Sequence, residues 1–107
     1  MNFNIDKNKL TDPLYIAKKL IRFPSETPKD EGALLFVEEI LSLLGLECFR
    51  MPSGDPLGTG RDALINNLYA KIGAGKTLCF AGHTDVVPAG NKDKWSSSPF
   101  EAQLINN

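Results

Sequence analysis

The chain has 107 residues, of which 42% are hydrophobic and 23% charged, a composition typical of one globular domain with a single core. Its formal net charge of −1 excludes the basic field that attracts nucleic acid or anionic lipid. Its apolar runs are far shorter than the ~20 residues of a membrane-spanning helix, and its polar start lacks the pattern of a secretion signal. We therefore expect a cytoplasmic α/β domain that binds neither nucleic acid nor membrane.

Two amphipathic helices are predicted in the first half of the chain. The first begins at Asp12-Pro13, because Asp accepts hydrogen bonds from free helical amides and Pro suits the first helical position. It ends before Pro24, which disfavours the helical conformation of the preceding residue. After a turn at residues 25–28, a second helix is expected from about Asp30 to Leu44, with Gly45 suited to the left-handed conformation that follows a helix.

Strand-like segments are predicted in the second half. Leu46–Met51 has a strand pattern, and residues 52–62 form a loop by composition. Leu64–Ile72 is expected to be a strand that turns at a glycine-rich stretch and pairs as a hairpin with Thr77–Gly82. A last strand-like segment covers Glu101–Ile105.

The two cysteines, Cys48 and Cys79, both lie in apolar, strand-like surroundings. Free cysteine is among the residue types most often buried. We therefore expect both thiols to be reduced and buried, as in a reducing compartment, with a structural disulfide as the weaker alternative.

The segment Ala70–Thr77 fits a loose form of the phosphate-loop pattern, which ends in Gly-Lys-Thr. Phosphate binding there needs a helix N-terminus directly behind the Lys-Thr pair. The residues that follow are apolar and β-prone and run into Gly82 and Pro88, so a tight turn with a solvated Lys76 is the favoured interpretation. A non-catalytic binding domain, including nucleotide binding through Lys76, is the alternative of a different functional class.

The strongest candidate site is the pair His83 and Asp85. His83 is the only histidine and directly follows an apolar run. In an extended chain, side chains two residues apart point the same way, so the imidazole and the carboxylate meet at the end of a predicted strand. Neutral imidazole is a good zinc ligand, and a carboxylate on its other nitrogen fixes the tautomer. The spacing alone leaves a metal site and a simple histidine–acid pair equally open.

The wider motif resembles that of a known family. Gly82-His-Thr-Asp-Val-Val-Pro-Ala-Gly90, followed by Trp95 and Pro99-Phe100, is similar to the first metal-site motif of the dinuclear zinc amidohydrolases and metallopeptidases. This family includes succinyl-diaminopimelate desuccinylases, aminoacylases, acetylornithine deacetylases and carboxypeptidase G-type enzymes. Leu20–Pro28 also resembles the exit of the first desuccinylase helix. The resemblance covers nearly the whole chain, and Asn91 departs from it, because desuccinylases usually carry an acid there.

The resemblance implies a fold and a chemistry. The fold would be the N-terminal part of a three-layer αβα zinc-peptidase-like catalytic domain, two helices followed by strands. His83 would bind one of two zinc ions, with cobalt as an alternative metal, and Asp85 would be the catalytic partner that orients the imidazole. The reaction would be hydrolysis of a small succinylated amino acid, N-succinyl-LL-2,6-diaminopimelate, to succinate and LL-2,6-diaminopimelate in lysine biosynthesis.

The family's other metal ligands and its general base have no matching positions in this sequence. Catalytic zinc takes three protein ligands, which one His and one Asp do not supply. We therefore expect residues 1–107 to be a partial metallohydrolase domain, truncated at the C-terminus and inactive alone. The homodimer contacts of full-length family members would also lie outside it. A related acyl-amino-acid deacylase or carboxypeptidase is the alternative within the family.

Overall fold

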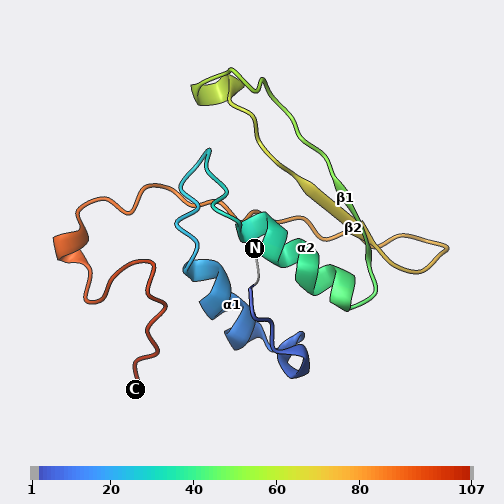
Figure 1. The fold of residues 1–107 in the computed structure, drawn as a ribbon, viewed down its shortest axis with the longest axis horizontal. Helices are drawn as coiled ribbons and strands as arrows, with labels where there is room; N and C mark the ends of the chain where they lie inside the picture. Colours follow the sequence, from blue (N-terminus) through green and yellow to red (C-terminus); the bar gives the residue numbers. More distant parts are fainter. Residues whose placement is uncertain (1–2, 107) are drawn as a thin grey trace.

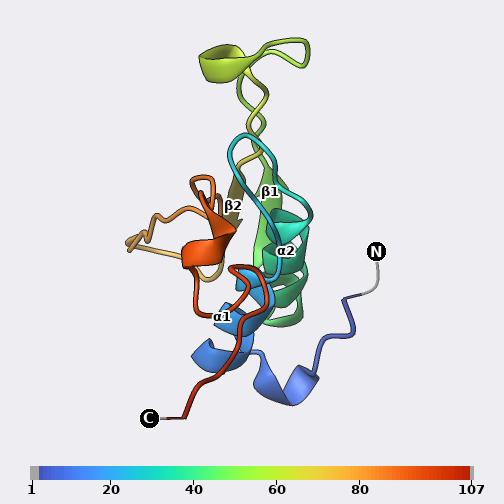
Figure 2. The same ribbon diagram turned by 90° about the vertical axis from the view of Figure 1, so that its left-hand side faces the viewer.

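A computed structural model describes residues 3–106 of the chain. In this range two α-helices, α1 (Pro13–Ile21) and α2 (Ala33–Leu43), precede two short strands, β1 (Glu47–Arg50) and β2 (Leu68–Lys71). The strand pair lies along α2, and the C-terminal segment returns toward α1 (Figures 1 and 2). No helix within residues 3–106 is long and apolar enough to cross a membrane. These elements are compatible with a fragment of an α/β fold.

Helix α1 begins where the sequence predicts. The Asp12 side chain accepts hydrogen bonds from the amides of Leu14, at 2.9 Å, and Tyr15, at 3.2 Å, while Pro13 occupies the first helical position. The helix ends at Ile21, two residues before Phe23, whose helical conformation is disfavoured by the proline that follows it. The predicted first helix is therefore confirmed.

Helix α2 is confirmed as a helix but starts three residues later than predicted. The Asp30 carboxylate accepts hydrogen bonds from the amides of Gly32, at 3.1 Å, and Leu34, at 3.0 Å. Gly32 has a φ of 96°, a left-handed conformation that helical residues do not adopt, so the helix begins only at Ala33. Its end is followed by Gly45 at a φ of 87°, as the sequence predicts.

The core lies on the inner face of α2. Phe36 is fully buried, and its ring lies 5.7 Å from that of Phe3 and 5.8 Å from that of Phe23, measured between centroids. The other buried apolar residues among those described are Ala33, Leu34, Ile40 and Ala63. This small aromatic cluster joins the chain start, the exit of α1 and the middle of α2.

The sheet is an antiparallel pair. Its register places Glu47 opposite Lys71 and Phe49 opposite Tyr69. The Phe49 and Tyr69 rings lie 6.2 Å apart between centroids, and the Lys71 ammonium lies 3.3 Å from the Glu47 carboxylate. Cross-strand contacts of this kind stabilise a pair of strands, so β1 and β2 are both confirmed as strands and are partners of each other.

The predicted hairpin between β2 and Thr77–Gly82 is wrong, because β2 pairs with β1 instead. Residues 77–82 are outside any strand, with Leu78 80% and Phe80 89% exposed. A strand that is apolar on both faces is stable where other elements pack against both faces. No sheet within the described range includes residues 77–82. The predicted strand at Glu101–Ile105 is also wrong, since this segment is irregular and largely exposed.

The cysteines differ in their surroundings. Both are free thiols, as predicted. Cys48 on β1 is half-buried, with its sulfur 3.9 Å from the Glu38 carbonyl oxygen. Cys79 is exposed, so the prediction that it is buried is wrong, because it belongs to the uncovered segment 77–82.

Candidate functional site

The segment that carries His83 and Asp85 is held by the connector between α1 and α2. The Val86 amide donates to the Ser25 carbonyl at 2.9 Å, and the Thr27 amide donates to the Val86 carbonyl at 3.0 Å. These two bonds make a short parallel bridge, so the backbone on the C-terminal side of Asp85 is fixed by residues far away in the sequence.

Side chains of the same connector add to this contact. The Ser25 side chain is buried, with 2% of the residue exposed, and its hydroxyl donates to the Thr84 carbonyl at 2.9 Å. The Thr27 hydroxyl donates to Oδ2 of Asp85. The Ser25 hydroxyl thus binds the backbone next to Asp85, and the Thr27 hydroxyl binds the Asp85 carboxylate itself.

The loop that follows is also organised by hydrogen bonds. The Ala89 amide donates to Glu26 Oε1 at 3.1 Å, and the Trp95 indole nitrogen donates to the Ala89 carbonyl at 3.0 Å. The Asn91 side chain accepts from the Asp93 amide at 2.9 Å and caps a short 3-10 turn. A carboxylate oxygen could accept the same bond, so Asn91 suits this turn as well as the acid that the resemblance predicts at this position.

The structure brings His83 and Asp85 together. Nδ1 of His83 lies 2.9 Å from the backbone carbonyl oxygen of Asp85 and 3.3 Å from its Oδ1. The nearer partner is therefore the carbonyl and not the carboxylate that the sequence points to. The His83 side chain is 82% exposed, so its ring position depends on these polar contacts and not on packing.

Asp85 carries its charge at neutral pH. The hydrogen bond from Thr27 is the largest influence and lowers the pKa of the carboxyl below its ordinary value of 3.8, with His83 acting in the same direction and partial burial opposing it. Since both oxygens that face Nδ1 are acceptors, the ring proton belongs on Nδ1, and Nε2 keeps the lone pair that a metal needs.

The donor set supplies part of a metal site. His83 offers one imidazole ligand with a carboxylate partner, the pair that zinc sites commonly use. Across residues 3–106, no group of three or more His, Cys, Asp and Glu side chains is placed to hold a metal ion. The residues present therefore fit one ligand position of a catalytic zinc site, and the other positions need donors from elsewhere.

Two clefts meet at His83. The first, of about 160 Å³, has a mixed lining whose polar residues include Lys29, Asp30, Asn66, Asn67 and Asp85. The second, of about 460 Å³, is apolar and includes Leu20, Phe23, Val86, Val87, Trp95 and Phe100. Among the described residues, His83 is the ionisable residue that lines the second cleft. This surface is therefore suited to packing against apolar groups and not to binding a charged substrate.

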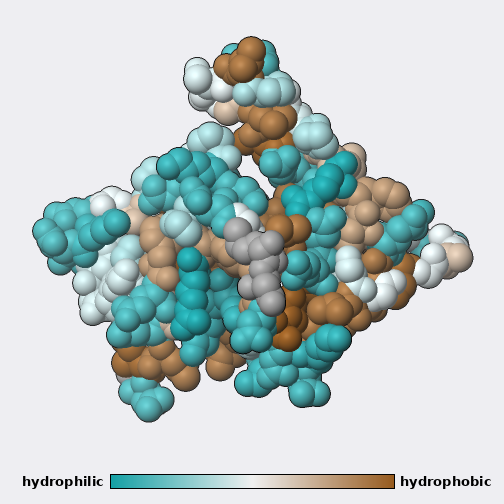
Figure 3. All heavy atoms as spheres, viewed as in Figure 1, coloured by the Kyte–Doolittle hydropathy of each residue, from teal (hydrophilic) through white to brown (hydrophobic). Residues whose placement is uncertain are grey.

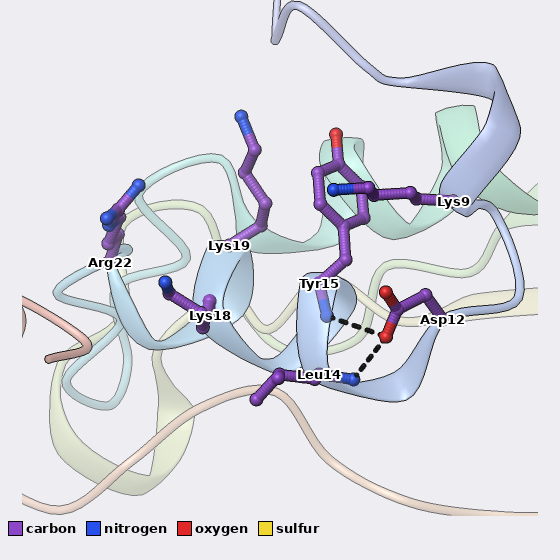
Figure 4. Close-up of a pocket in the computed structure, with 7 residues that line it drawn as sticks. All are labelled: Lys9, Asp12, Leu14, Tyr15, Lys18, Lys19 and Arg22. Carbon is purple, nitrogen blue, oxygen red and sulfur yellow. Dashed lines mark hydrogen bonds between the residues drawn. The ribbon is translucent and has the colours of Figure 1, made fainter. Parts of the chain in front are cut away.

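A third cleft, of about 250 Å³, lies at α1 and is separate from the site (Figure 4). Its charged and aromatic lining residues are Lys9, Asp12, Tyr15, Lys18, Lys19 and Arg22. The ammonium groups of Lys9 and Lys19 lie 5.9 and 5.6 Å from the Tyr15 ring centroid, and Arg22 Nε donates to the Glu101 carbonyl at 3.3 Å. Through these contacts the charged side chains of this cleft pack against Tyr15 and join α1 to the C-terminal segment.

Lys76 lies in an exposed bend after β2. Residues 77–85 contain no helix, so the helix N-terminus that a phosphate loop requires is not formed behind Lys76. Nucleotide binding through Lys76 stays a prediction without structural support.

No protein-family model matches the chain. It is 49% identical over 96 residues to the succinyl-diaminopimelate desuccinylase of Rhodospirillum centenum. The matched segment covers 89% of this chain and 24% of that protein. It is 43% identical over 97 residues to the same enzyme of Ehrlichia canis, covering 90% of this chain and 24% of that protein. It is 47% identical over 98 residues to the succinyl-diaminopimelate desuccinylase of Rhodospirillum rubrum, and the match covers 91% of this chain and 24% of that protein. The chain is similar to the succinyl-diaminopimelate desuccinylases.

The likeness that the sequence motifs predict is thus confirmed, and it extends over about nine-tenths of the chain. The chain spans about a quarter of the length of these desuccinylases. Their name identifies them as hydrolases that remove a succinyl group.

What the motifs missed is the role of Ser25 and Thr27, which the sequence assigns only to a turn. The available signal was the pair of hydroxyls within the desuccinylase-like stretch Leu20–Pro28.

Proposed function

We propose that the chain is part of a desuccinylase-like, metal-dependent amide hydrolase, to which it contributes one zinc ligand, His83. One observation carries the proposal. In a chain 49% identical to a desuccinylase, the only histidine is exposed and has Nδ1 turned to two oxygens of Asp85. This arrangement keeps Nε2 available, which a metal ligand needs and a buried structural histidine does not.

The residues of the chain have defined tasks in this proposal. His83 would hold one of two zinc ions, or cobalt in their place, through Nε2. Asp85 would orient the imidazole and raise its basicity by accepting a hydrogen bond from the Nδ1–H group. A bound zinc ion would supply an acidified water and a polarised amide carbonyl. The connector residues Ser25 and Thr27 would keep both side chains in place.

The rest of the enzyme would come from polypeptide beyond this chain, since the relatives are about four times as long. It would supply the other metal ligands, the general base and the homodimer contacts, and it would complete a three-layer αβα domain around the helices and strands seen here. The substrate would be a small succinylated amino acid, N-succinyl-LL-2,6-diaminopimelate, hydrolysed in the cytoplasm on the route to lysine.

A chimera tests the proposal. This chain would replace the matched 96-residue segment of the Rhodospirillum centenum desuccinylase. We expect the chimera to hydrolyse succinyl-diaminopimelate and its His83→Ala variant to lose activity to background while keeping its circular dichroism spectrum. Thr59→Ala, at an exposed loop position outside the site and outside segment 77–82, is the control and should leave activity unchanged.

The 107-residue chain alone, with added zinc, should show no hydrolysis, because it supplies one ligand where three are needed. Measurable turnover by the chain alone would contradict the claim that it is incomplete. A folded chimera that keeps full activity after His83→Ala would contradict the role of His83. Hydrolysis of N-acetyl amino acids in preference to the succinylated substrate would favour the related deacylases.

A further inference from the structure

Thr27 contacts the candidate site through its side chain although it lies 58 residues before Asp85 in the sequence. Its hydroxyl donates to Oδ2 of Asp85, while Oδ1 of the same carboxylate lies 3.3 Å from Nδ1 of His83. A carboxylate is planar, so a bond that fixes one oxygen also fixes the direction of the other. The hydroxyl of Thr27 therefore favours the orientation in which Oδ1 faces the imidazole.

The backbone brings the Thr27 hydroxyl to this position and holds it there. The Thr27 amide donates to the Val86 carbonyl at 3.0 Å, and the Val86 amide donates to the Ser25 carbonyl at 2.9 Å. The Ser25 hydroxyl adds a bond to the Thr84 carbonyl at 2.9 Å. Threonine is also branched at Cβ, which restricts rotation about its first side-chain bond. The donor is thus fixed at both the backbone and the side chain.

His83 has no comparable support from packing. Its side chain is 82% exposed, and the contacts of Nδ1 are with the two oxygens of Asp85. In such a ring the hydrogen bond at one nitrogen determines which tautomer is present at the other. The carbonyl contact at 2.9 Å belongs to the backbone, so the carboxylate contact at 3.3 Å is the one that a side-chain change can alter.

We propose that Thr27 is a positioning residue for His83, acting through Asp85. Thr27 holds the carboxylate against Nδ1, which keeps the ring proton on Nδ1 and leaves Nε2 as the ligating nitrogen. The inference rests on the proposed function for the identity of the metal ligand. The hydrogen bond from Thr27 to the Asp85 carboxylate and the 3.3 Å contact of that carboxylate with Nδ1 are observed independently of it.

Nitrogen-15 NMR of the imidazole tests the proposal on the full 107-residue chain. His83 is the only histidine, so its two ring nitrogens give the only imidazole signals. At about pH 9, where an ordinary histidine is neutral, we expect two well-separated signals that assign the proton to Nδ1. In Thr27→Val the two signals should move toward each other as the tautomers mix. Thr27→Ser, which restores a hydroxyl, should return them to the wild-type positions.

Thr77→Val makes the same chemical change at an exposed position and should leave the signals unchanged. The Val86 amide resonance reports whether the backbone bridge survives each change, and Thr27→Ala replaces Thr27→Val if the latter does not fold. Wild-type signals with the proton on Nε2 would overturn the proposal without any variant. Unchanged signals in a folded Thr27→Val would overturn it as well. The measurement needs neither metal nor substrate, so its failure is distinct from failure of the chimera.

Discussion

At the scale of single residues, Ser25 has the most distinctive environment. It is the buried polar residue of the described chain, with 2% of its surface exposed, and its hydroxyl donates to the Thr84 carbonyl at 2.9 Å. This bond is part-buried, and a typical intramolecular hydrogen bond contributes about 0.5–1.5 kcal/mol to stability. Ser25 therefore stabilises the segment that leads from His83 to Asp85, although it touches neither side chain in a hydrogen bond.

Replacement of Ser25 by alanine should lower the free energy of unfolding by about 0.5–1.5 kcal/mol, the contribution of a typical hydrogen bond. Urea denaturation followed by the fluorescence of Trp95, the only tryptophan, measures this loss close to the affected loop. Ser96→Ala is the same change at an exposed position and should alter the free energy by less than about 0.5 kcal/mol. Equal midpoints for the two variants would show that the Ser25 bond contributes nothing.

Residue-scale features of the site were predictable only where they are local. That His83 and Asp85 lie together follows from their spacing, because residues two apart share a face in an extended chain. The contact with Thr27 spans 58 residues, and nothing in the sequence pairs these two positions. The nearer contact of Nδ1 with the Asp85 carbonyl depends on backbone conformation, which side-chain patterns do not report.

At the scale of elements, α2 carries the core through Phe36. The ring is fully buried and contacts the rings of Phe3 and Phe23. Large apolar side chains removed from a core cost both their transfer free energy and that of the cavity left behind. The packing of α2 against the chain start and the exit of α1 therefore depends on one side chain.

Phe36→Ala should lower the free energy of unfolding by about 3–5 kcal/mol, a large part of the 5–15 kcal/mol that stabilises a typical domain. Thermal unfolding followed by helical circular dichroism measures this effect. Leu35→Ala, at the neighbouring position where 36% of the residue is exposed, should cost far less. A similar loss for both variants would mean that the aromatic cluster is not the core.

The elements themselves were predictable to different degrees. Helix ends depend on nearby residues, so Asp12 and Gly45 mark them well in the sequence. The start of α2 was missed by three residues, because Asp30 binds the amides of a left-handed Gly32 before the helix begins. Strand pairing is not local. The strand β2 was found, but its partner is β1 and not Thr77–Gly82, and no local pattern decides between two candidate neighbours.

At the scale of the whole molecule, the chain exposes more surface than its size requires. Its accessible surface is 8382 Å², whereas a compact protein of this mass exposes about 5,900 Å². Its radius of gyration is 15.8 Å, against about 13 Å for a compact domain of this length. Apolar groups contribute to this excess, and Figure 3 shows them reaching the surface at several places. The excess is comparable with the area buried in a large protein–protein interface.

The uncovered apolar surface should make the isolated chain bind the dye ANS and elute ahead of a monomer in size-exclusion chromatography. The segment 77–82 is the best place to test this, because Leu78 is 80% and Phe80 is 89% exposed. Leu78→Glu combined with Phe80→Glu should reduce both signals without changing the helical circular dichroism. Ser96→Glu with Ser98→Glu adds the same charge at exposed polar positions and should leave the ANS signal unchanged. A monomeric wild type with no ANS fluorescence would contradict the uncovered state of this segment. In the chimera the same glutamates should abolish folding, since there the segment is expected to be buried.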